Sequence, residues 1–456
     1  MSNALNSKGW LSIILLAAAG VFATLSVPRF EGDAPRIIGP ATLDLGNAGA
    51  TLSLKVLDEG TGLRSVQMRL VHGGGGQELF SKEFGGGLLS VGDGGMLHEV
   101  SVELDPKALR LADGSATVIV TARDRAWQNL GDGNRSEVGI KINVDTKPPS
   151  ITTSNALIYV YRGGAAAATY RVNEIAASDG IRVGERLYRG YPAPGHDPAK
   201  GIRIAFFAVP VHATANPKIE LEAIDHAGNR ATTRLRAKVF ERNFPEERLS
   251  LSSRFLDGVI PPLAEKVGVS AGTNVESFQV INRDVRKKNE ERIQSLIQNS
   301  DSERHWTKSF TQLAKSKVMS RFAEQRRYFT GEREISQATH YGFDLASRAA
   351  APIGAANRGR VVFADELGIY GNCVLIDHGM GITSLYAHLT DFEVKVDEMV
   401  ERGQSIGRTG ATGLAGGDHL HFAILVGGTY VDPLEWWDPR WIKSHVDARL
   451  KAVSSS

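Results

Sequence analysis

The chain has 456 residues, which is enough for about three domains of ordinary size. Its 53 Lys and Arg residues nearly balance its 51 Asp and Glu residues, so the composition lacks the basic footprint of a nucleic-acid-binding protein and predicts no nucleic-acid partner. The single cysteine, Cys373, excludes an intramolecular disulfide and a cysteine-rich zinc site. Any bound metal must therefore be held by imidazole and carboxylate groups.

The first predicted element is an uncharged run from Leu11 to Val27, about 17 residues, which is near the lower limit for a helix that crosses a bilayer. Two interpretations remain open. One is a retained signal anchor within residues 1–28, and the other is a signal peptide cleaved near Val21-Phe22-Ala23. Both predict export. The anchor, which we favour, predicts a single-pass protein of the inner (cytoplasmic) membrane with most of its chain in the periplasm.

Residues 29–148 are predicted to form a β-sandwich, because apolar residues recur at every second position. The alternation is found in residues 52–56, 66–70, 100–104, 118–120 and 138–144. Turn-forming clusters, such as the glycines at 73–76, separate these stretches as in an antiparallel sandwich. The stretch ends at the stiff linker Lys147-Pro148-Pro149.

Residues 149–242 are predicted to form a second, related sandwich. Ala122 to Asn129 and Ala223 to Asn229 share an Ala-x-Asp-x-Ala turn followed by Asn, which indicates an internal repeat of about 100 residues. The two stretches resemble bacterial immunoglobulin-like domains, in which such a turn is common. This resemblance concerns the fold and not an activity. Neither stretch clusters histidines or paired carboxylates, so a spacer or binding role is expected.

Residues 243–330 are predicted to form a helical connector. The apolar residues have a helical period, which includes Ile293, Leu296 and Ile297 and extends through Phe310, Leu313, Ala314, Val318 and Phe322. Residues 283–327 contain twelve basic and six acidic residues, a local net charge of +6. The charge is explained by a solvated helical face or by contact with an anionic wall polymer or phospholipid headgroups.

The chemistry-bearing residues all lie in the last third of the chain. His340 and Asp344 flank Gly342, which favours an extended chain with both side chains on one face. His419 and His421 are two apart, so a strand would direct both imidazoles to the same side. Leu385-Tyr386-Ala387-His388-Leu389 supplies a further histidine at a predicted strand end. Each motif is weak alone, but the ordered set is specific.

This set resembles the lysostaphin-like (LytM-type) zinc peptidases, whose motifs His-x-Gly-x-Asp, Tyr-Ala-His-Leu and His-Leu-His occur here in order. The resemblance covers residues 339–433, about a fifth of the chain. It implies an antiparallel β metallopeptidase domain, placed at residues 331–439 and followed by a helical tail at 440–456. It also implies one Zn²⁺ per chain, held by His340, Asp344 and His421, with His388 and His419 as unliganded catalytic imidazoles.

Three protein ligands with one open position are typical of a catalytic zinc site. Two imidazoles suit proton transfer near neutral pH, and no His-Glu-x-x-His motif supplies a glutamate base. The sequence does not decide which of His388 and His419 takes the proton from the attacking water.

The resulting expectation is an exported zinc endopeptidase that cuts peptide bonds in the stem or cross-links of peptidoglycan. The alternatives are a non-enzymatic regulator that activates wall amidases and a wall-polymer binding protein. The expected partners are the peptidoglycan peptide, the cytoplasmic membrane through the N-terminal helix, and a possible regulatory protein.

Three other residues near or within this region have expected roles. His378 is expected to be structural or to support the site from behind, with direct help at the site as the alternative. His445 is expected to be solvated. Cys373 is expected to be a small buried apolar residue and not a nucleophile, because no basic neighbour lowers its pKa.

Overall fold

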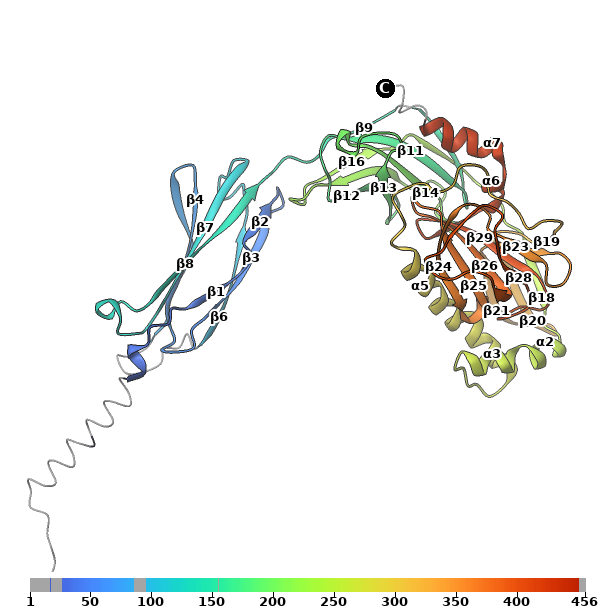
Figure 1. Ribbon diagram of the computed structural model, residues 1–456, viewed down its shortest axis with the longest axis horizontal. Helices are drawn as coiled ribbons and strands as arrows, with labels where there is room; N and C mark the ends of the chain where they lie inside the picture. The colour runs from blue at the N-terminus through green and yellow to red at the C-terminus, as the bar shows by residue number, and fades with distance from the viewer. Residues whose placement is uncertain (1–16, 18–26, 86–95, 155, 451–456) are drawn as a thin grey trace, which may run out of the picture. The chain divides into compact units, whose positions relative to one another are not determined.

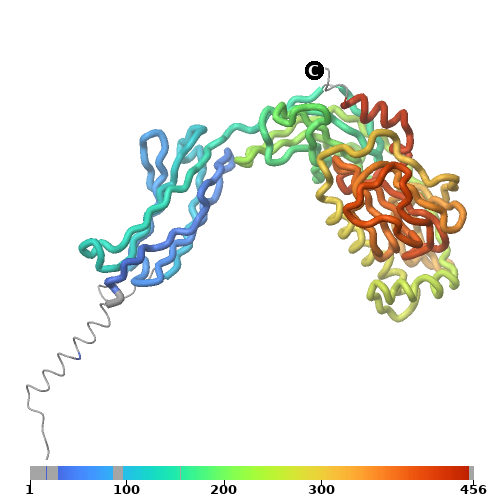
Figure 2. The backbone as a smooth tube through the Cα atoms, in the orientation of Figure 1, coloured from blue at the N-terminus to red at the C-terminus, as the bar shows by residue number. Residues whose placement is uncertain are grey.

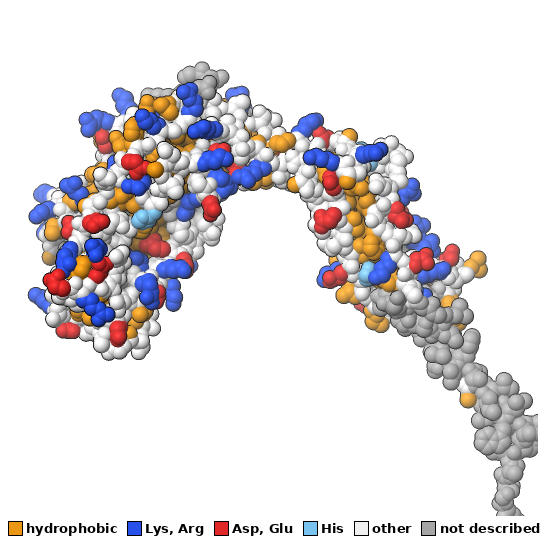
Figure 3. Space-filling view, turned by 180° about the vertical axis from the view of Figure 1, so that it is seen from behind, with side chains coloured by type: hydrophobic (Ala, Val, Ile, Leu, Met, Phe, Trp, Pro, Cys, Tyr) orange, Lys and Arg blue, Asp and Glu red, His pale blue; other side chains and the backbone are white. Residues whose placement is uncertain are grey.

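The structure is a computed structural model, and it describes residues 17, 27–85, 96–154 and 156–450. Nearly all of the predicted anchor, from Leu11 to Val27, lies outside these residues. Of the helices within them, none combines the length and the apolar character that a bilayer span requires. The chain divides into two compact units, residues 1–148 with 224–230 and residues 149–223 with 231–456. On the face drawn in Figure 3, basic and acidic side chains are interspersed in each unit.

The first unit contains two sheets that share one hydrophobic core (Figure 1). The alternating pattern is confirmed, because Leu52, Leu54 and Val56 on one sheet and Val66 and Met68 on the other are all buried. The smaller sheet has the order β1-β3-β6 and the larger one β2-β8-β7-β4-β5. Their bounds are β1 (Arg36–Ile38), β2 (Thr42–Leu45), β3 (Ala50–Leu57), β4 (Leu63–His72), β5 (Gly75–Glu83), β6 (Leu97–Leu104), β7 (Gly114–Asp124) and β8 (Arg135–Val144).

The second unit begins with a seven-stranded sheet of order β16-β15-β12-β13-β14-β11-β9 and a separate parallel pair, β10 and β17. The apolar residues of this sheet belong to the same hydrophobic cluster as those of the C-terminal region. The strands are β9 (Ile151–Thr153), β10 (Ile158–Tyr161), β11 (Ala165–Val172), β12 (Ser178–Val183), β13 (Arg186–Pro192), β14 (Ile202–Ala208), β15 (Ile219–Ile224), β16 (Arg230–Arg234) and β17 (Ala237–Phe240).

The connector is helical only in its middle. Its helices lie beside the C-terminal strands in Figures 1 and 2, and they are α2 (Ser253–Gly258), α3 (Ile260–Lys266), α4 (Asn274–Val280), the π-helical turn η4 (Ile281–Val285) and α5 (Arg286–Ile297). Short 3-10 turns occur at Val27–Phe30, Asn129–Gly131, Pro198–Lys200 and Gly368–Tyr370.

The predicted helix through Phe310, Leu313 and Phe322 is wrong. Residues 298–316 have no regular secondary structure, and the strands β19 (Lys317–Ser320) and β20 (Glu324–Thr330) follow them. Phe310 is buried against Trp436, with ring centroids 5.5 Å apart, and its backbone N–H donates to the Trp436 carbonyl. The apolar spacing therefore reflects tertiary packing of an irregular segment, which periodicity alone does not distinguish from a helix.

The C-terminal region is built on a ten-stranded antiparallel sheet with the main order β19-β22-β29-β26-β25-β24-β27. A three-stranded sheet, β18-β20-β21, lies earlier in the same unit. The bounds are β18 (Glu246–Ser250), β21 (Arg333–His340), β22 (Phe343–Ala346), β23 (Pro352–Gly354), β24 (Gly359–Glu366), β25 (Asn372–Asp377), β26 (Ile382–Phe392), β27 (Met399–Val400), β28 (Ser405–Thr409), β29 (Leu420–Val426) and β30 (Thr429–Val431).

The described part of the tail, residues 440–450, is helical and contains the end of α7 (Pro439–Trp441) and the π-helical turn η6 (Ile442–Asp447), while α6 (Pro433–Trp437) precedes it. The prediction that His445 is solvated is wrong. Its ring is half-buried and stacks on Trp441, with centroids 5.0 Å apart and planes inclined by 9°. One helical turn separates the two residues, so their side chains are neighbours on one face.

The α6 residue Glu435 should make stability depend on pH. It is buried and accepts a 2.8 Å hydrogen bond from the backbone N–H of Ala165, and burial raises its pKa to about 8. The unfolded chain has the ordinary pKa of about 4.3, so it loses this proton first and stability falls as the pH rises from about 4 to 8. Glu435→Gln should unfold at a higher temperature than the unmodified protein at pH 8.5, and this advantage should vanish near pH 4. If the melting temperatures of the variant and the unmodified protein differed by the same amount at both pH values, Glu435 would not be the source of the pH dependence.

Candidate metal centre

Three strands bring the predicted metal ligands together. His340 is the last residue of β21, Asp344 lies in β22, and His421 lies in β29. The register pairs Asp344 directly with His421, and pairs His421 on its other side with Ala387 of β26, next to His388. The predicted single extended segment from His340 to Asp344 is wrong, because Tyr341 and Gly342 leave one sheet and enter the other. The two ligands converge from separate sheets.

The ligand atoms form a nearly equilateral triangle. His340 Nε2, Asp344 Oδ1 and His421 Nδ1 are 2.9 Å from one another in all three pairings. Donors of a tetrahedral zinc site lie about 3.3 Å apart, since the metal–ligand bonds are about 2.0–2.1 Å long. The triangle therefore needs to widen by only a few tenths of an ångström to hold a divalent metal, and His340, Asp344 and His421 are the candidate ligands.

The surroundings orient each ligand. His340 donates its Nδ1 proton to the carbonyl of Arg321 at 2.9 Å, which leaves Nε2 as the metal-facing nitrogen. Gly342 packs so closely on His421 that a Cβ atom at 342 would lie 2.7 Å from the imidazole Nε2. A side chain at position 342 would also lie 2.6 Å from the Phe422 carbonyl oxygen, so the glycine of the motif is required by its close approach to β29.

The electrostatics suit a metal site. Burial would raise the pKa of Asp344, but His340 and His421 more than offset this effect and hold that pKa well below its usual range. Burial lowers the pKa of His421 to about 4. The carboxylate is therefore charged and the His421 imidazole neutral at neutral pH, which are the forms that bind metals.

His388 and His419 lie beside the triangle without belonging to it. Their ring centroids are 4.8 Å apart, and His419 Nε2 is 3.6 Å from Asp344 Oδ1. His388 donates from Nδ1 to the Thr412 carbonyl, and His419 donates from Nδ1 to the Gly417 carbonyl, each at 2.8 Å. Each imidazole therefore keeps Nε2 available for another partner. Burial lowers the pKa of His388 to about 3, so this ring is neutral before any metal binds.

The backbone at His388 is unusual. Its φ angle of +65° lies in the left-handed region, which residues other than glycine seldom adopt. The pairing of β26 with β28 shifts register just beyond it, between Leu389 and Asp391. Such local strain is held in place by the surrounding sheet and is characteristic of functional sites.

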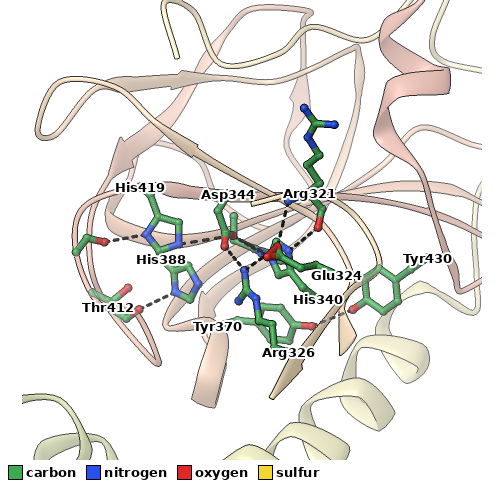
Figure 4. Close-up of polar contacts among 12 residues, drawn as sticks. Arg321, Glu324, Arg326, His340, Asp344, Tyr370, His388, Thr412, His419 and Tyr430 are labelled. Atoms are coloured by element: carbon green, nitrogen blue, oxygen red, sulfur yellow. Dashed lines mark hydrogen bonds and ion pairs between the residues drawn. The ribbon is translucent and has the colours of Figure 1, made fainter. Parts of the chain in front are cut away.

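Arg326 is the main site residue that sequence reasoning missed. It lies in β20, outside every motif, and its Nη2 donates to Asp344 Oδ2 at 2.7 Å while Asp344 Oδ1 faces the two histidines (Figure 4). Arg326 thereby fixes the carboxylate with one oxygen toward the candidate metal. Only the fold brings β20 next to β22, so no local signal in the sequence identifies this partner.

Removing this partner should weaken metal binding. Arg326→Met should lower zinc affinity about 10- to 100-fold, the usual effect of losing an outer partner of a metal ligand. Competition against a chromogenic chelator measures this change. Arg327→Met is a matched control, because the adjacent Arg327 bonds Glu334 and not a ligand. Equal zinc affinities of the two variants would show that Arg326 does not orient Asp344.

A cavity of about 410 Å³ opens over the site and is lined by the three ligands, His388 and His419. Leu414, Ala415 and Gly416 also line it. Other lining residues come from the connector, a contribution that the sequence did not indicate: Leu249, Ser250, Leu251, Ser252, Phe255, Phe278, Arg286, Arg326 and Tyr328.

His378 and Cys373 take no part in this cavity. His378 is fully buried, with Nδ1 2.8 Å from the Arg358 carbonyl and Nε2 2.7 Å from Ser384 Oγ, and burial lowers its pKa to about 4. Its structural role is confirmed. Cys373 is also fully buried, and burial raises the pKa of its thiol, so the prediction of an unreactive apolar residue is confirmed.

Comparison with known proteins agrees with this geometry. The model of peptidase family M23 matches residues 338–433. The DD-carboxypeptidase/endopeptidase Mpg of Neisseria meningitidis is 38% identical over 95 residues, which are 21% of this chain and 22% of that protein. The peptidoglycan DD-endopeptidase ShyB of Vibrio cholerae is 36% identical over 96 residues, again 21% and 22% of the two chains. The chain thus spans about a fifth of the length of these relatives.

A solved structure of a putative peptidase M23 from Pseudomonas aeruginosa is 18% identical and covers 60% of this chain and 93% of that one, with a TM-score of 0.37. The family match includes every residue of the triangle together with His388 and His419. Residues 338–433, which contain all five candidate site residues, therefore match peptidase family M23.

Proposed function

We propose that the protein is an exported zinc endopeptidase that hydrolyses peptide bonds in the stem or cross-links of peptidoglycan. The observation that carries the proposal is that one cavity contains both a set of metal donors and two further imidazoles. The triangle of His340, Asp344 and His421 supplies three metal donors, and two further imidazoles lie beside it with Nε2 unused by the backbone. The relatives named as peptidoglycan DD-endopeptidases support this substrate class.

A bound zinc ion would polarise the scissile carbonyl and acidify an attacking water molecule. The chain's own residues complete the requirements of hydrolysis. Hydrogen bonds to backbone carbonyls fix the rings of His388 and His419, so Nε2 of each can accept or donate a proton at the reacting groups. Arg326 holds Asp344 with Oδ1 directed toward the two histidine ligands.

The complete donor set counts against a purely regulatory role without catalysis. Such a protein would not need three metal donors and two oriented imidazoles in one cavity. The two strand-rich stretches, residues 29–148 and 149–242, are proposed to be immunoglobulin-like spacers that carry the peptidase domain, residues 331–439. The apolar N-terminal run is proposed to anchor the chain in the cytoplasmic membrane, with these domains in the periplasm.

The test uses the full chain loaded with zinc and incubated with purified cell-wall sacculi. New amino groups should appear in proportion to cleaved bonds. The release should stop when a chelator removes the metal and return when zinc is restored. If the zinc-loaded chain releases no amino groups from sacculi or soluble cross-linked muropeptides, the proposed function is wrong.

A further inference from the structure

The connector provides a second wall of the cavity, outside the residues that match the peptidase family. Phe255 of α2, Phe278 of α4 and Arg286, the first residue of α5, line the same cavity as the metal ligands. The two phenylalanines contact each other edge to face, with ring centroids 6.4 Å apart, and Phe278 is fully buried. The helices of the connector therefore give the cavity an apolar surface beside the cationic side chain of Arg286.

Arg286 differs from the other charged residues of the cavity. Arg326 and Asp344 neutralise each other at 2.7 Å. Arg286 instead donates from Nε to the Asn282 carbonyl at 3.2 Å and from Nη2 to Asn282 Oδ1 at 2.7 Å. Within the described part of the chain, no carboxylate lies at ion-pair distance from it. Its guanidinium therefore lines the cavity with donors left over and no anion bound to them.

The nearest acidic group does not fill this role. Glu290, one helical turn beyond Arg286, accepts a 2.5 Å hydrogen bond from the hydroxyl of Tyr370. Burial raises the pKa of Glu290, while the tyrosine hydrogen bonds and the more distant charge of Arg286 partly oppose this shift. Tyr370 in turn lies 3.2 Å from the hydroxyl of Tyr430. The carboxyl of Glu290 is thus engaged by tyrosines, which leaves the charge of Arg286 without a bonded counterpart.

We propose that Arg286 binds a free carboxylate of the substrate peptide and so selects the peptides that are cut. This inference rests on the proposed function. A stem peptide carries a free α-carboxylate at its glutamate and, where the cross-linking diamino acid has two carboxyl groups, a second one beside the leaving amine. A guanidinium binds such a group through two parallel hydrogen bonds, and the partly enclosed cavity strengthens the attraction.

A merely structural role for Arg286 makes a different prediction. Its bonds to Asn282 lie across the π-helical turn η4, and their loss would lower stability and slow the cleavage of every substrate by the same factor. Binding of a carboxylate would instead change the preference between a charged substrate and its amide. The ratio of the two values of kcat/KM therefore separates the two roles.

The experiment uses the full zinc-loaded chain and three cross-linked muropeptide dimers. The first has free carboxylates at both positions, the second is amidated at the leaving-side α-carboxylate, and the third is amidated at the glutamate α-carboxylate. The variants are Arg286→Gln and Arg286→Lys. The matched control is Arg283→Gln, which removes an equal charge from an exposed arginine outside the cavity that is paired with Asp284. Melting temperatures show which variants fold.

For the unmodified chain and the Arg283→Gln control, one of the two amidations should lower kcat/KM about 10- to 100-fold, mainly through KM. That amidation identifies the carboxylate that is bound. Arg286→Gln should cut the charged dimer and this amide at the same low rate, and Arg286→Lys should keep part of the preference. If neither amidation slows the unmodified chain, the inference fails even when Arg286→Gln does not fold. The inference also fails if each amidation lowers kcat/KM of Arg286→Gln by the same factor as it lowers kcat/KM of the unmodified chain. Cleavage of none of the dimers would contradict the proposed function itself.

Discussion

Replacing His421 with alanine should remove the metal and the peptidase activity together. His421 Nδ1 is 2.9 Å from both Asp344 Oδ1 and His340 Nε2, so it supplies one of three donors. The variant would leave two donors and a vacant volume in a buried site. Metal analysis of the purified protein should find about one zinc per chain before the substitution and almost none after it. The same preparation should release no amino groups from sacculi.

The control for this result is His226→Ala, which removes an exposed imidazole that does not line the cavity. It should keep both zinc and activity. If His421→Ala retained zinc at the level of this control, the triangle would not be the metal site, and the assignment of all three ligands would have to be withdrawn.

Replacing His388 should separate catalysis from metal binding. His388 lies in the cavity but outside the triangle of donors, and its Nδ1 is bound to the Thr412 carbonyl. Loss of a general acid or base typically costs a factor of about 10² to 10⁴. His388→Ala should therefore keep one zinc per chain while kcat falls by about that factor.

The backbone at this position calls for a second variant. With φ at +65°, alanine at position 388 carries a conformational cost of about 1–2 kcal/mol, whereas asparagine tolerates the left-handed region better. His388→Asn should therefore match His388→Ala in its loss of kcat but melt at a higher temperature. If both variants lost zinc to the same extent as His421→Ala, the division between ligands and catalytic imidazoles would be overturned.

Local patterns in the sequence predicted strands at the site histidines, and the resemblance to the lysostaphin-like zinc peptidases predicted the roles of these residues. The two-residue spacing of His419 and His421 and the alternation of the first sandwich depend only on the period of a strand. The strands of residues 29–148 were found for this reason. The sequence did not predict that the chain changes sheet between His340 and Asp344, because a short segment that passes between two sheets has no distinct periodicity.

The contacts that the sequence did not predict all join residues far apart in the chain. Arg326 meets Asp344 because β20 and β22 come together in the fold, and Glu290 meets Tyr370 across 80 residues of sequence. The same reason explains the error at Phe310 and Leu313, whose apolar character comes from packing in an irregular segment against the C-terminal region. The apolar character of such residues predicts that they are buried, but it does not predict their secondary structure.

The connector accordingly has a larger role than its sequence suggested. Its basic character was explained by a solvated face or by contact with an anionic polymer. Two of its arginines, Arg286 and Arg326, instead line the metal-site cavity. Arg283, Arg292 and Arg327 are exposed. The connector thus forms part of the metal-site cavity, and removing it should impair the proposed catalysis.

The most direct test of the proposed activity is mass spectrometry of muropeptides before and after treatment with the zinc-loaded full chain. Cross-linked dimers should decrease, and uncross-linked peptides should increase by a matching amount. This change should be absent for His421→Ala and for the chelated protein. If a chain with one zinc bound leaves the dimers, the cross-links and the stem peptides unchanged in mass, the protein is not a peptidoglycan endopeptidase.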